Sequence, residues 1–139
     1  MYQKLTLIGN LGRDPEMRYT PSGQAVTNLS LATNRTWTDA SDQRIKETTW
    51  FRVSVWGRQA EACNQYLRKG SKVLVEGRLT VDPATGGPRI WTRQDGTAGA
   101  SFEVTANLVQ FLSSREDDET YQQGDGFAGQ VAEEEDIPF

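Results

Sequence analysis

Five runs of alternating apolar and polar residues, interrupted by a single helical stretch, leave few folds open to this chain. The runs are residues 3–11, 25–33, 48–56, 72–80 and 102–112. Alternation with a period of two is typical of a strand that buries one face. Between the third and fourth runs, Ala60, Cys63 and Leu67 recur at helical spacing. The stretch 58–69 that holds them is followed by Gly70, a common helix stop. We therefore expect an all-β body with one helix.

The order of these elements narrows the fold further. Three strands, one helix and two strands is the order of a five-stranded OB-fold barrel, whose helix lies between the third and fourth strands. Residues 12–15 (GRDP) predict a turn after the first strand. We expect residues 34–46, which are mostly polar, to form a hairpin arm. Residues 81–100 are dense in Gly, Pro and Asp, which predicts a long exposed loop or ribbon.

The formal net charge of −4 conceals two regions of opposite sign. Residues 1–112 hold 14 basic and 10 acidic side chains, a net charge of +4. Residues 113–139 hold one basic and nine acidic side chains, a net charge of −8, with few apolar residues. A segment of this composition cannot bury enough apolar area to offset the entropy of ordering it. The sequence therefore predicts a folded domain over 1–112 that favours an anionic ligand, and a disordered acidic tail over 113–139.

Missing residue types exclude several classes of function. The chain has no His and one Cys, so it cannot form an internal disulfide, a Cys- or His-rich zinc site, or a catalytic centre that uses His. No apolar run reaches the length of about 18 residues that a membrane span needs, and the N-terminal residues lead into a strand pattern rather than a signal peptide. We expect a cytoplasmic protein that is not an enzyme, with no catalytic residue, metal, cofactor or membrane partner.

Two tryptophans and an arginine share the face of the third predicted strand that points away from the core. Because side chains alternate along a strand, Phe51, Val53 and Val55 share the predicted core face. The opposite face holds Trp50, Arg52, Ser54 and Trp56. Indole rings can stack on nucleic-acid bases, and a guanidinium can pair with phosphate. The two rings are six residues apart, about 20 Å along a strand, which leaves room for several nucleotides. The alternative is that each indole is buried against its own domain or against another subunit.

The two other tryptophans stand in polar stretches beside basic residues. Trp37 is near Arg35 and Lys46 in the expected hairpin arm, and Trp91 is near Arg93 in the expected loop or ribbon. Aromatic residues interleaved with basic ones are typical of surfaces that bind single-stranded nucleic acid. The alternative for each arm is that it packs against another subunit. The full set of candidate DNA-binding residues is Trp37, Trp50, Trp56, Trp91, Arg35, Lys46, Arg52, Arg58, Lys69, Lys72, Arg78 and Arg93.

The last four residues, Asp136, Ile137, Pro138 and Phe139, combine an acid, two large apolar side chains and a terminal carboxylate. Such a combination suits capture by an apolar pocket with a basic rim on a partner protein. The acidic segment is also suited to compete with an anionic ligand for the basic domain. The alternative is an acidic tail that only promotes solubility.

Other short motifs carry no function here. Residues 124–129 (GDGFAG) match a dinucleotide-binding pattern, but they follow no strand and open no helix. Asp14 and Glu16 form an acidic pair without a third ligand nearby, which is too little for a two-metal nuclease site. Cys63 lies on the apolar face of the predicted helix and is interpreted as a small core residue.

Several longer stretches resemble the bacterial single-stranded DNA-binding protein family. They are residues 8–19 (IGNLGRDPEMRY), 31–33 (LAT), 49–53 (TWFRV), 66–71 (YLRKGS) and the Asp-Ile-Pro-Phe terminus. The resemblance implies an OB-fold homotetramer in the bacterial cytoplasm, associated with the nucleoid, that wraps single-stranded DNA without sequence preference. It also implies base stacking at the four tryptophans, backbone contacts at residues such as Arg52, Arg58 and Lys69, and docking of the terminus onto replication, recombination and repair proteins. Two other classes remain as alternatives: an OB-fold adaptor for proteins or structured RNA, and a nuclease or other hydrolase.

Overall fold

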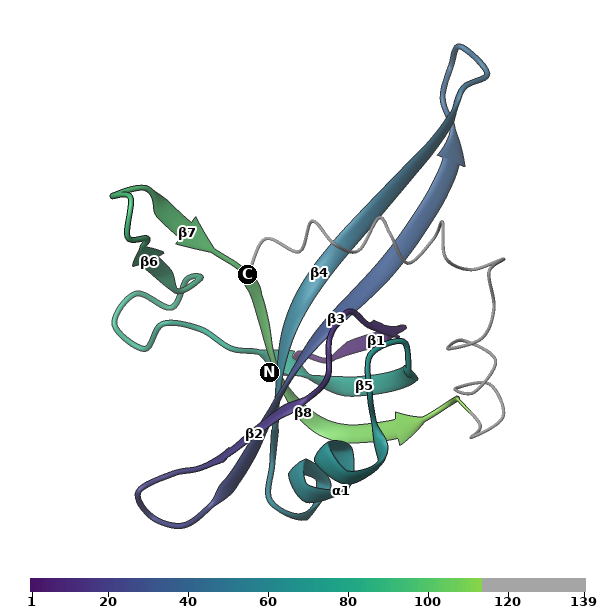
Figure 1. Cartoon of the computed structure of the whole chain (residues 1–139). Helices are drawn as coiled ribbons and strands as arrows, with labels where there is room; N and C mark the ends of the chain where they lie inside the picture. The colour runs from purple at the N-terminus through teal and green to yellow at the C-terminus, as the bar shows by residue number, and fades with distance from the viewer. Residues whose placement is uncertain (114–139) are drawn as a thin grey trace.

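Five strands close into a barrel in the computed structural model, which describes residues 1–113 (Figure 1). The elements are β1 (Leu5–Leu11), β2 (Glu16–Tyr19), β3 (Ala25–Thr38), β4 (Arg44–Trp56), α1 (Arg58–Tyr66), β5 (Lys72–Leu79), β6 (Ile90–Thr92), β7 (Ala98–Ala100) and β8 (Phe102–Phe111). Around the barrel the strand order is β1-β5-β8-β4-β3, and β3 returns to β1 through the pairs Asn10–Ala32 and Leu11–Leu31. The five-stranded OB barrel and its single helix are confirmed. Except for Ser113, the predicted acidic tail lies outside the described residues.

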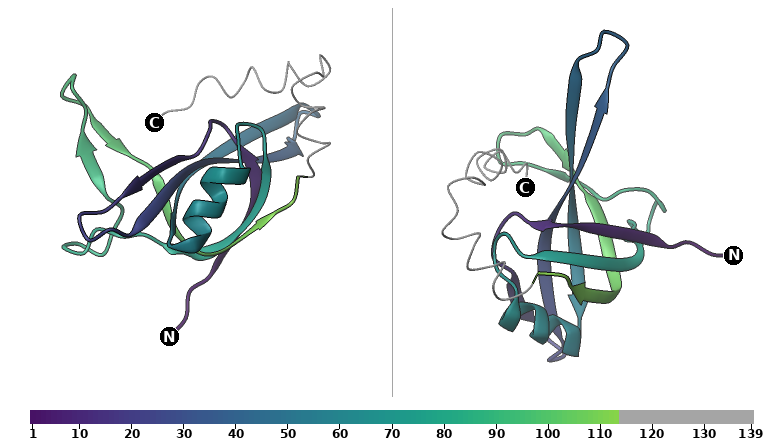
Figure 2. Two further views of the ribbon diagram at one scale, coloured as in Figure 1. Left: turned by 60° about the horizontal axis from the view of Figure 1, so that its bottom comes forward. Right: turned by 90° about the vertical axis from the view of Figure 1, so that its right-hand side faces the viewer.

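The inward faces of the strands form an apolar core. Its fully buried members are Leu11, Leu29, Leu31, Val53, Val55, Cys63, Val73, Val75 and Val104. The inward face predicted for the third strand is therefore confirmed at Val53 and Val55. Helix α1 lies across one end of the barrel (Figure 2) and covers the core there with Ala60 and Cys63. Each large apolar side chain buried in this way contributes roughly 1.5–3 kcal/mol to folding.

Two arms project from the barrel, and the longer one is a continuation of two regular strands, β3 and β4 (Figure 1). The pairing of β3 with β4 continues from Val26–Trp56 to Thr38–Arg44, so both strands run well into the stretch that was assigned to an arm. The outer part of this arm is mostly polar, with only Trp37 and Ile45 paired as large apolar residues, so it lacks the sustained alternation that marks a half-buried strand. The shorter arm is the β6–β7 ribbon, in agreement with the expectation for residues 81–100.

Three local predictions differ from the structure. A short strand, β2, follows the turn after β1 and pairs with the first four residues of β3; its length of four residues left no measurable alternation. The helix ends at Tyr66 rather than at residue 69, because Leu67 has an extended backbone with ψ of 153°. Alternation predicts that Leu79 shares a side of its strand with Val73 and Val75; its pairing with Val104 agrees with that side, but Leu79 is 46% exposed. It is the last residue of β5, at the end of the strand beyond its last buried position.

Candidate nucleic-acid interface

The outward residues of β4 lie on one continuous surface of five strands. One row of paired residues crosses this surface from β2 to β5: Glu16, Asn28, Ser54, Thr105 and Arg78. Neighbouring rows contain Trp56 beside Val26 and Arg52 beside Ser30. Trp50, Arg52, Ser54 and Trp56 therefore share a face, as their alternation predicts. We call this set of four residues the β4 platform.

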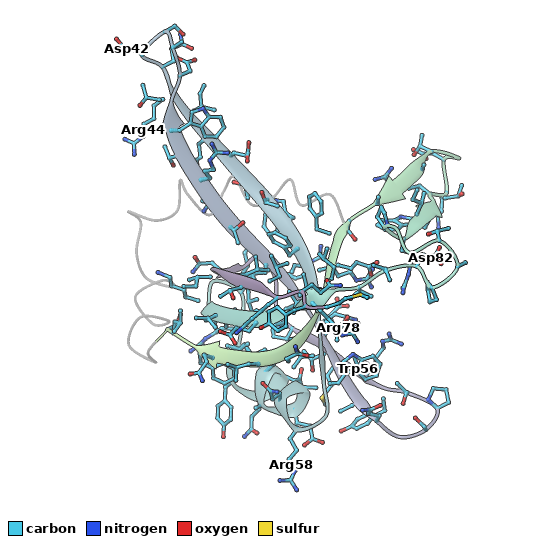
Figure 3. All side chains as sticks on the ribbon, turned by 180° about the vertical axis from the view of Figure 1, so that it is seen from behind. Asp42, Arg44, Trp56, Arg58, Arg78 and Asp82 are labelled. Carbon is cyan, nitrogen blue, oxygen red and sulfur yellow. The ribbon has the colours of Figure 1, made fainter. Side chains whose placement is uncertain are left out.

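Both indoles of the β4 platform are accessible to solvent. Trp56 is 38% exposed and lies at the end of β4, while Trp50 is half-buried. Their cross-strand neighbours are Val26 and Ala32, which are too small to cover an indole ring. Figure 3 shows Trp56 near the end of the molecule where α1 carries Arg58. In the single chain, the platform is not sealed inside the domain, which was the alternative considered above.

A small polar pocket lies beside Arg52. It has a volume of about 140 Å³ and is lined by Arg13, Glu16, Asn28, Leu29, Ser30 and Arg52. Sequence reasoning did not find Arg13, Asn28 or Ser30, because their proximity to Arg52 depends on how the three strands pair. Charges of both signs occur on this surface: Glu103 is in register with Arg52, and its Oε2 lies 3.9 Å from Nε of Arg89.

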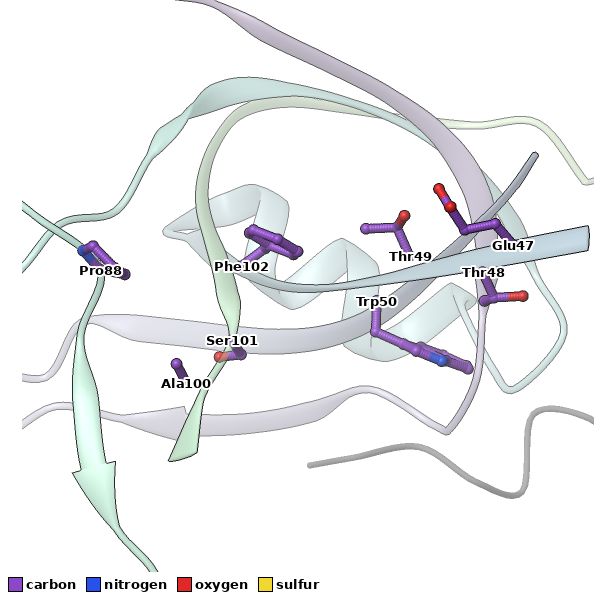
Figure 4. Close-up of a pocket in the computed structure, with 8 residues that line it drawn as sticks. All are labelled: Glu47, Thr48, Thr49, Trp50, Pro88, Ala100, Ser101 and Phe102. Atoms are coloured by element: carbon purple, nitrogen blue, oxygen red, sulfur yellow. The ribbon is translucent and has the colours of Figure 1, made fainter. Parts of the chain in front are cut away.

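A larger groove separates the two arms where the pairing of β4 with β8 stops. Its volume is about 520 Å³, and it is lined by Glu47, Thr48, Thr49, Trp50, Pro88, Ala100, Ser101 and Phe102. Figure 4 shows Thr49 and Phe102 on one side of β4 and the Trp50 indole on the other. The exposed ring of Phe102 lies 5.8 Å from that of Phe51. The Trp50 side chain therefore lines this groove as well as the β4 platform.

Trp37 lies on the opposite face of the long arm from Trp50. The strand register pairs Trp37 with Ile45 and Trp50 with Ala32, so the two indoles differ in the parity that sets the face of the ribbon. The guanidinium of Arg35 lies 4.4 Å from the centre of the Trp37 ring, a cation–π contact that accompanies Trp37 on its own face. Lys46 pairs with Thr36 and lies on the Trp50 face. The arm therefore presents one indole on each face, with a basic residue on each side.

On the short arm, Trp91 lies across a glycine. Trp91 is paired with Gly99, and a Cβ atom added to Gly99 would come within 2.6 Å of the indole Nε1. A guanidinium nitrogen of Arg93 donates a hydrogen bond to the carbonyl oxygen of Ala98. The short arm therefore repeats the combination of an indole with a nearby guanidinium.

The remaining predicted cations fall into two groups. Arg78 belongs to the row that crosses the β4 platform, and the exposed Arg58 begins α1 next to Trp56. Lys69 and Lys72 lie beyond α1, near the start of β5, and are not part of the platform. The structure thus divides the candidate residues among the platform, the two arms and the α1 end of the barrel. Figure 3 shows part of this spread, with Arg78 near the middle of the molecule and Arg58 on α1 at the end opposite the tip of the long arm.

The one thiol of the chain, that of Cys63, is buried in the core. Burial raises the pKa of the Cys63 thiol from 9.0 to about 11, so the thiol ionises only at strongly alkaline pH. Within residues 1–113, Cys, Asp and Glu side chains nowhere gather in threes close enough to hold a metal ion. The single described helix is neither long enough nor apolar enough to span a bilayer.

Known proteins resemble this chain in both sequence and fold. A family model described as the single-strand binding protein family matches residues 2–112. A single-stranded DNA-binding protein of Neisseria meningitidis is 38% identical over 126 residues, which cover 88% of this chain and 68% of the relative. One from Wolinella succinogenes is 43% identical over 115 residues, or 83% of this chain and 67% of the relative.

Two solved structures share the fold. A Plasmodium falciparum SSB in complex with ssDNA superposes with a TM-score of 0.65 at 29% identity, covering 81% of this chain and 96% of that one. A deletion mutant of the single-stranded DNA binding protein from Thermus aquaticus superposes with a TM-score of 0.62 at 35% identity. That match covers 81% of this chain, and the chain spans about half, 51%, of the Thermus protein.

Proposed function

Because the chain belongs to the single-strand binding protein family, we propose that it binds single-stranded DNA through the β4 platform and the two arms. The observation that carries this proposal is the solvent-accessible face on which Arg52 lies between Trp50 and Trp56. A strand laid along β4 can stack its bases on the indoles while its phosphates meet the neighbouring cations. Each base–indole stack contributes roughly 1–3 kcal/mol.

The same geometry predicts weak sequence preference. Every base has a flat aromatic face, so stacking does not distinguish one base from another. Arginine and lysine contacts to phosphate carry no sequence information either. The function is therefore protection of an exposed strand by binding alone, and the protein is not an enzyme.

We further propose that the chain assembles as a homotetramer. Among the strands described, the edge of β1 before Asn10 pairs only with β5 and leaves its other edge open, which suits the addition of a strand from a second copy. The outer face of β1, β5 and β8 also carries exposed apolar residues, including Ile8 and Leu108. An edge and an apolar face together provide two separate interfaces, which is what a tetramer of dihedral symmetry requires. Linked subunits would raise affinity for long strands through effective concentration.

The acidic terminus is proposed to recruit replication, recombination and repair proteins. This proposal is supported by the chemistry of Asp136, Ile137, Pro138 and Phe139, which combine acid, apolar side chains and a free carboxylate. The net charge of −8 beyond residue 112 is also suited to compete with DNA for the cations of the domain.

Titration with oligo(dT) at low salt tests the DNA-binding proposal. Trp fluorescence should be quenched strongly, and Trp50→Ala and Trp56→Ala should each weaken binding by about ten-fold, with solution mass unchanged. Binding retained in a variant that combines Trp50→Ala with Trp56→Ala, or a changed mass, would favour an adaptor that uses these indoles for protein contacts. Cleavage of a labelled strand during incubation with magnesium would favour the hydrolase alternative.

A further inference from the structure

The face of β8 that continues the β4 platform carries a carboxylate, that of Glu103. In the parallel pairing of β4 with β8, Glu103 is in register with Arg52 and Thr105 with Ser54, so these side chains share one face. The Glu103 side chain is only 12% exposed. Within the described residues, its Oε2 is buried and accepts no hydrogen bond. A carboxylate in this position costs free energy through desolvation, and it also repels the phosphates of a polyanion, unless a cation compensates for its charge.

The guanidinium of Arg89 is that cation. Its Nε lies 3.9 Å from Oε2 of Glu103, within reach of an ion pair but too far for a hydrogen bond. The Arg89 side chain is 53% exposed, and with Nε toward the carboxylate its two terminal nitrogens are left for a phosphate. Arg52, the register partner of Glu103, instead lines the pocket that Asn28 and Ser30 form on the other side of β4. The ion pair of Glu103 is therefore with Arg89.

The loop that follows β5 brings Arg89 back to Glu103. The chain leaves β5 along β8, where the N–H of Thr80 donates a hydrogen bond to the carbonyl oxygen of Glu103 at 2.9 Å. It then turns back, and the N–H of Asp82 donates one to the carbonyl oxygen of Gly87, also at 2.9 Å. Two residues further out on each side of this turn, Arg89 comes opposite Thr80. The backbone therefore places Arg89 beside Glu103 before the ion pair forms.

Arg89 also lies close to Trp50. Pro88, the residue before Arg89, lines the same groove as the Trp50 side chain (Figure 4). Glu103, the ion-pair partner of Arg89, is in register with Arg52 on the β4 platform. A DNA strand stacked on Trp50 would therefore pass within reach of the Arg89 guanidinium.

We propose that Glu103 is a positioning residue for the binding of single-stranded DNA: its carboxylate holds the Arg89 guanidinium over the β4 platform, where Arg89 pairs with a phosphate of the strand. The inference rests on the proposed function and adds two residues that are absent from the predicted set of DNA-binding residues. An arginine on a loop samples many rotamers, and the ion pair removes part of this freedom before DNA binds. The alternative is an ordinary surface ion pair whose carboxylate only repels DNA.

The sign of the change caused by Glu103→Gln separates these two roles. If the carboxylate only repels phosphate, Glu103→Gln should bind DNA more tightly than the wild type. If it positions Arg89, the same variant should bind about two- to ten-fold more weakly, the factor for ordering one long side chain. Glu61→Gln is the matched control, because it removes the same charge from the exposed surface of α1. This control should only tighten binding slightly at low salt.

A double-mutant cycle in the full-length protein tests the inference. Titration with oligo(dT), followed by Trp fluorescence, measures the wild type, Glu103→Gln, Arg89→Gln and the variant with both changes. At about 0.05 M salt, Arg89→Gln should weaken binding by about eight-fold and lower the slope of log affinity against log salt by about 0.7, the loss of one phosphate contact. Addition of Glu103→Gln to Arg89→Gln should cause no further weakening, because Glu103 acts through Arg89. Urea unfolding checks that each variant remains folded.

Every other outcome contradicts the inference in a recognisable way. Tighter binding by Glu103→Gln, with or without Arg89, would show that the carboxylate only repels DNA. Equal weakening in both backgrounds would show that Glu103 supports the platform as a whole and does not act through Arg89. Wild-type affinity and salt dependence in Arg89→Gln would rule out the phosphate contact. In these three cases the wild type still binds DNA, whereas a wild type whose fluorescence is not quenched would contradict the proposed function and the inference with it.

Discussion

Gly9 stands at the seam where the barrel closes. A Cβ atom added there would lie 2.2 Å from the carbonyl oxygen of Ala32 on β3, a separation that atoms cannot adopt without moving the backbone. The neighbouring pair Asn10–Ala32 joins β1 to β3 and completes the ring of strands. Glycine is therefore required at this position by the closeness of the two backbones and not by an unusual φ angle.

Gly9→Ala should consequently lower the free energy of unfolding by about 3 kcal/mol, since the core cannot repack around a backbone clash. Urea unfolding measures the change. Gly87→Ala is the control, because a Cβ atom at residue 87 would meet only Oγ1 of Thr85, at an ordinary 3.6 Å. Equal stability of the two variants would show that β1 and β3 are not in close contact at the seam.

The buried thiol of Cys63 makes the free energy of unfolding depend on pH in the alkaline range. Burial raises the pKa of its thiol from 9.0 to about 11. Well below pH 9.0 the thiol is protonated in both the folded and the unfolded chain, so it adds no pH dependence there. Between the two values only the unfolded chain ionises, which favours unfolding as the pH rises. By about pH 10.5 the loss should reach about 2 kcal/mol relative to neutral pH.

Comparison of wild type with Cys63→Ala isolates this effect from the titration of tyrosines and lysines. The difference in unfolding free energy between the two proteins, measured in urea at about pH 8 and about pH 10.5, should narrow by that same amount of about 2 kcal/mol. A difference that is independent of pH would mean that the thiol ionises equally in the folded and unfolded states.

Three hairpin turns of the structure share one geometry. In each, the first and fifth residues are joined by a backbone hydrogen bond from the first N–H to the fifth carbonyl, over residues 20–24, 39–43 and 93–97. The fourth residue has a positive φ: 84° at Gly23, 60° at Asp42 and 89° at Gly96. This is the three-residue loop in which a left-handed residue follows a type I turn. Glycine occupies that position twice, and the long arm has aspartate there.

Asp42→Gly should therefore stabilise the tip of the long arm, because glycine adopts a positive φ without the steric cost that a Cβ atom brings. We expect slower hydrogen exchange at the Asp39 and Gln43 amides by a factor of about two to five, equivalent to roughly 0.5–1 kcal/mol. Asp42→Val should speed exchange at the same amides, since a β-branched side chain opposes this conformation. Unchanged exchange in both variants would contradict the strained turn.

Sequence reasoning succeeded where one face of a strand is buried. The run 48–56 alternates clearly, and both its inward face and its four outward residues were predicted. Residues 34–38 and 44–47 hold only two large apolar residues, Trp37 and Ile45, so the same reasoning predicted an arm there and not two strands, because a period of two requires a repeated contrast between faces. The face of Trp37 depends on the register of β3 with β4, which no local pattern encodes. The pocket beside Arg52 depends in the same way on pairing between three strands.

At the scale of the whole molecule, the two parts of the chain carry net charges of opposite sign. The domain carries +4 over residues 1–112, and the remainder carries −8. The cations are spread over the platform, the arms and the α1 end rather than gathered in one patch. On the proposed function, a strand of DNA would pass over much of the domain to meet them, and an acidic segment tethered to the same chain would compete at a high local concentration.

Removal of residues 133–139 separates competition by charge from docking of the terminus. This deletion takes away four carboxylates together with Ile137 and Phe139, and it should tighten poly(dT) binding at low salt. The gain should vanish near 1 M salt, where screening shortens the reach of a charge to about 3 Å. A second variant, Ile137→Ala with Phe139→Ala, keeps every charge, so it should bind DNA as the wild type does while losing the capture of replication and repair proteins. If this second variant also tightened DNA binding, the apolar side chains would have to contact the domain. The tail would then compete with DNA by occupying a binding site, and not through the electrostatic effect of its negative charge.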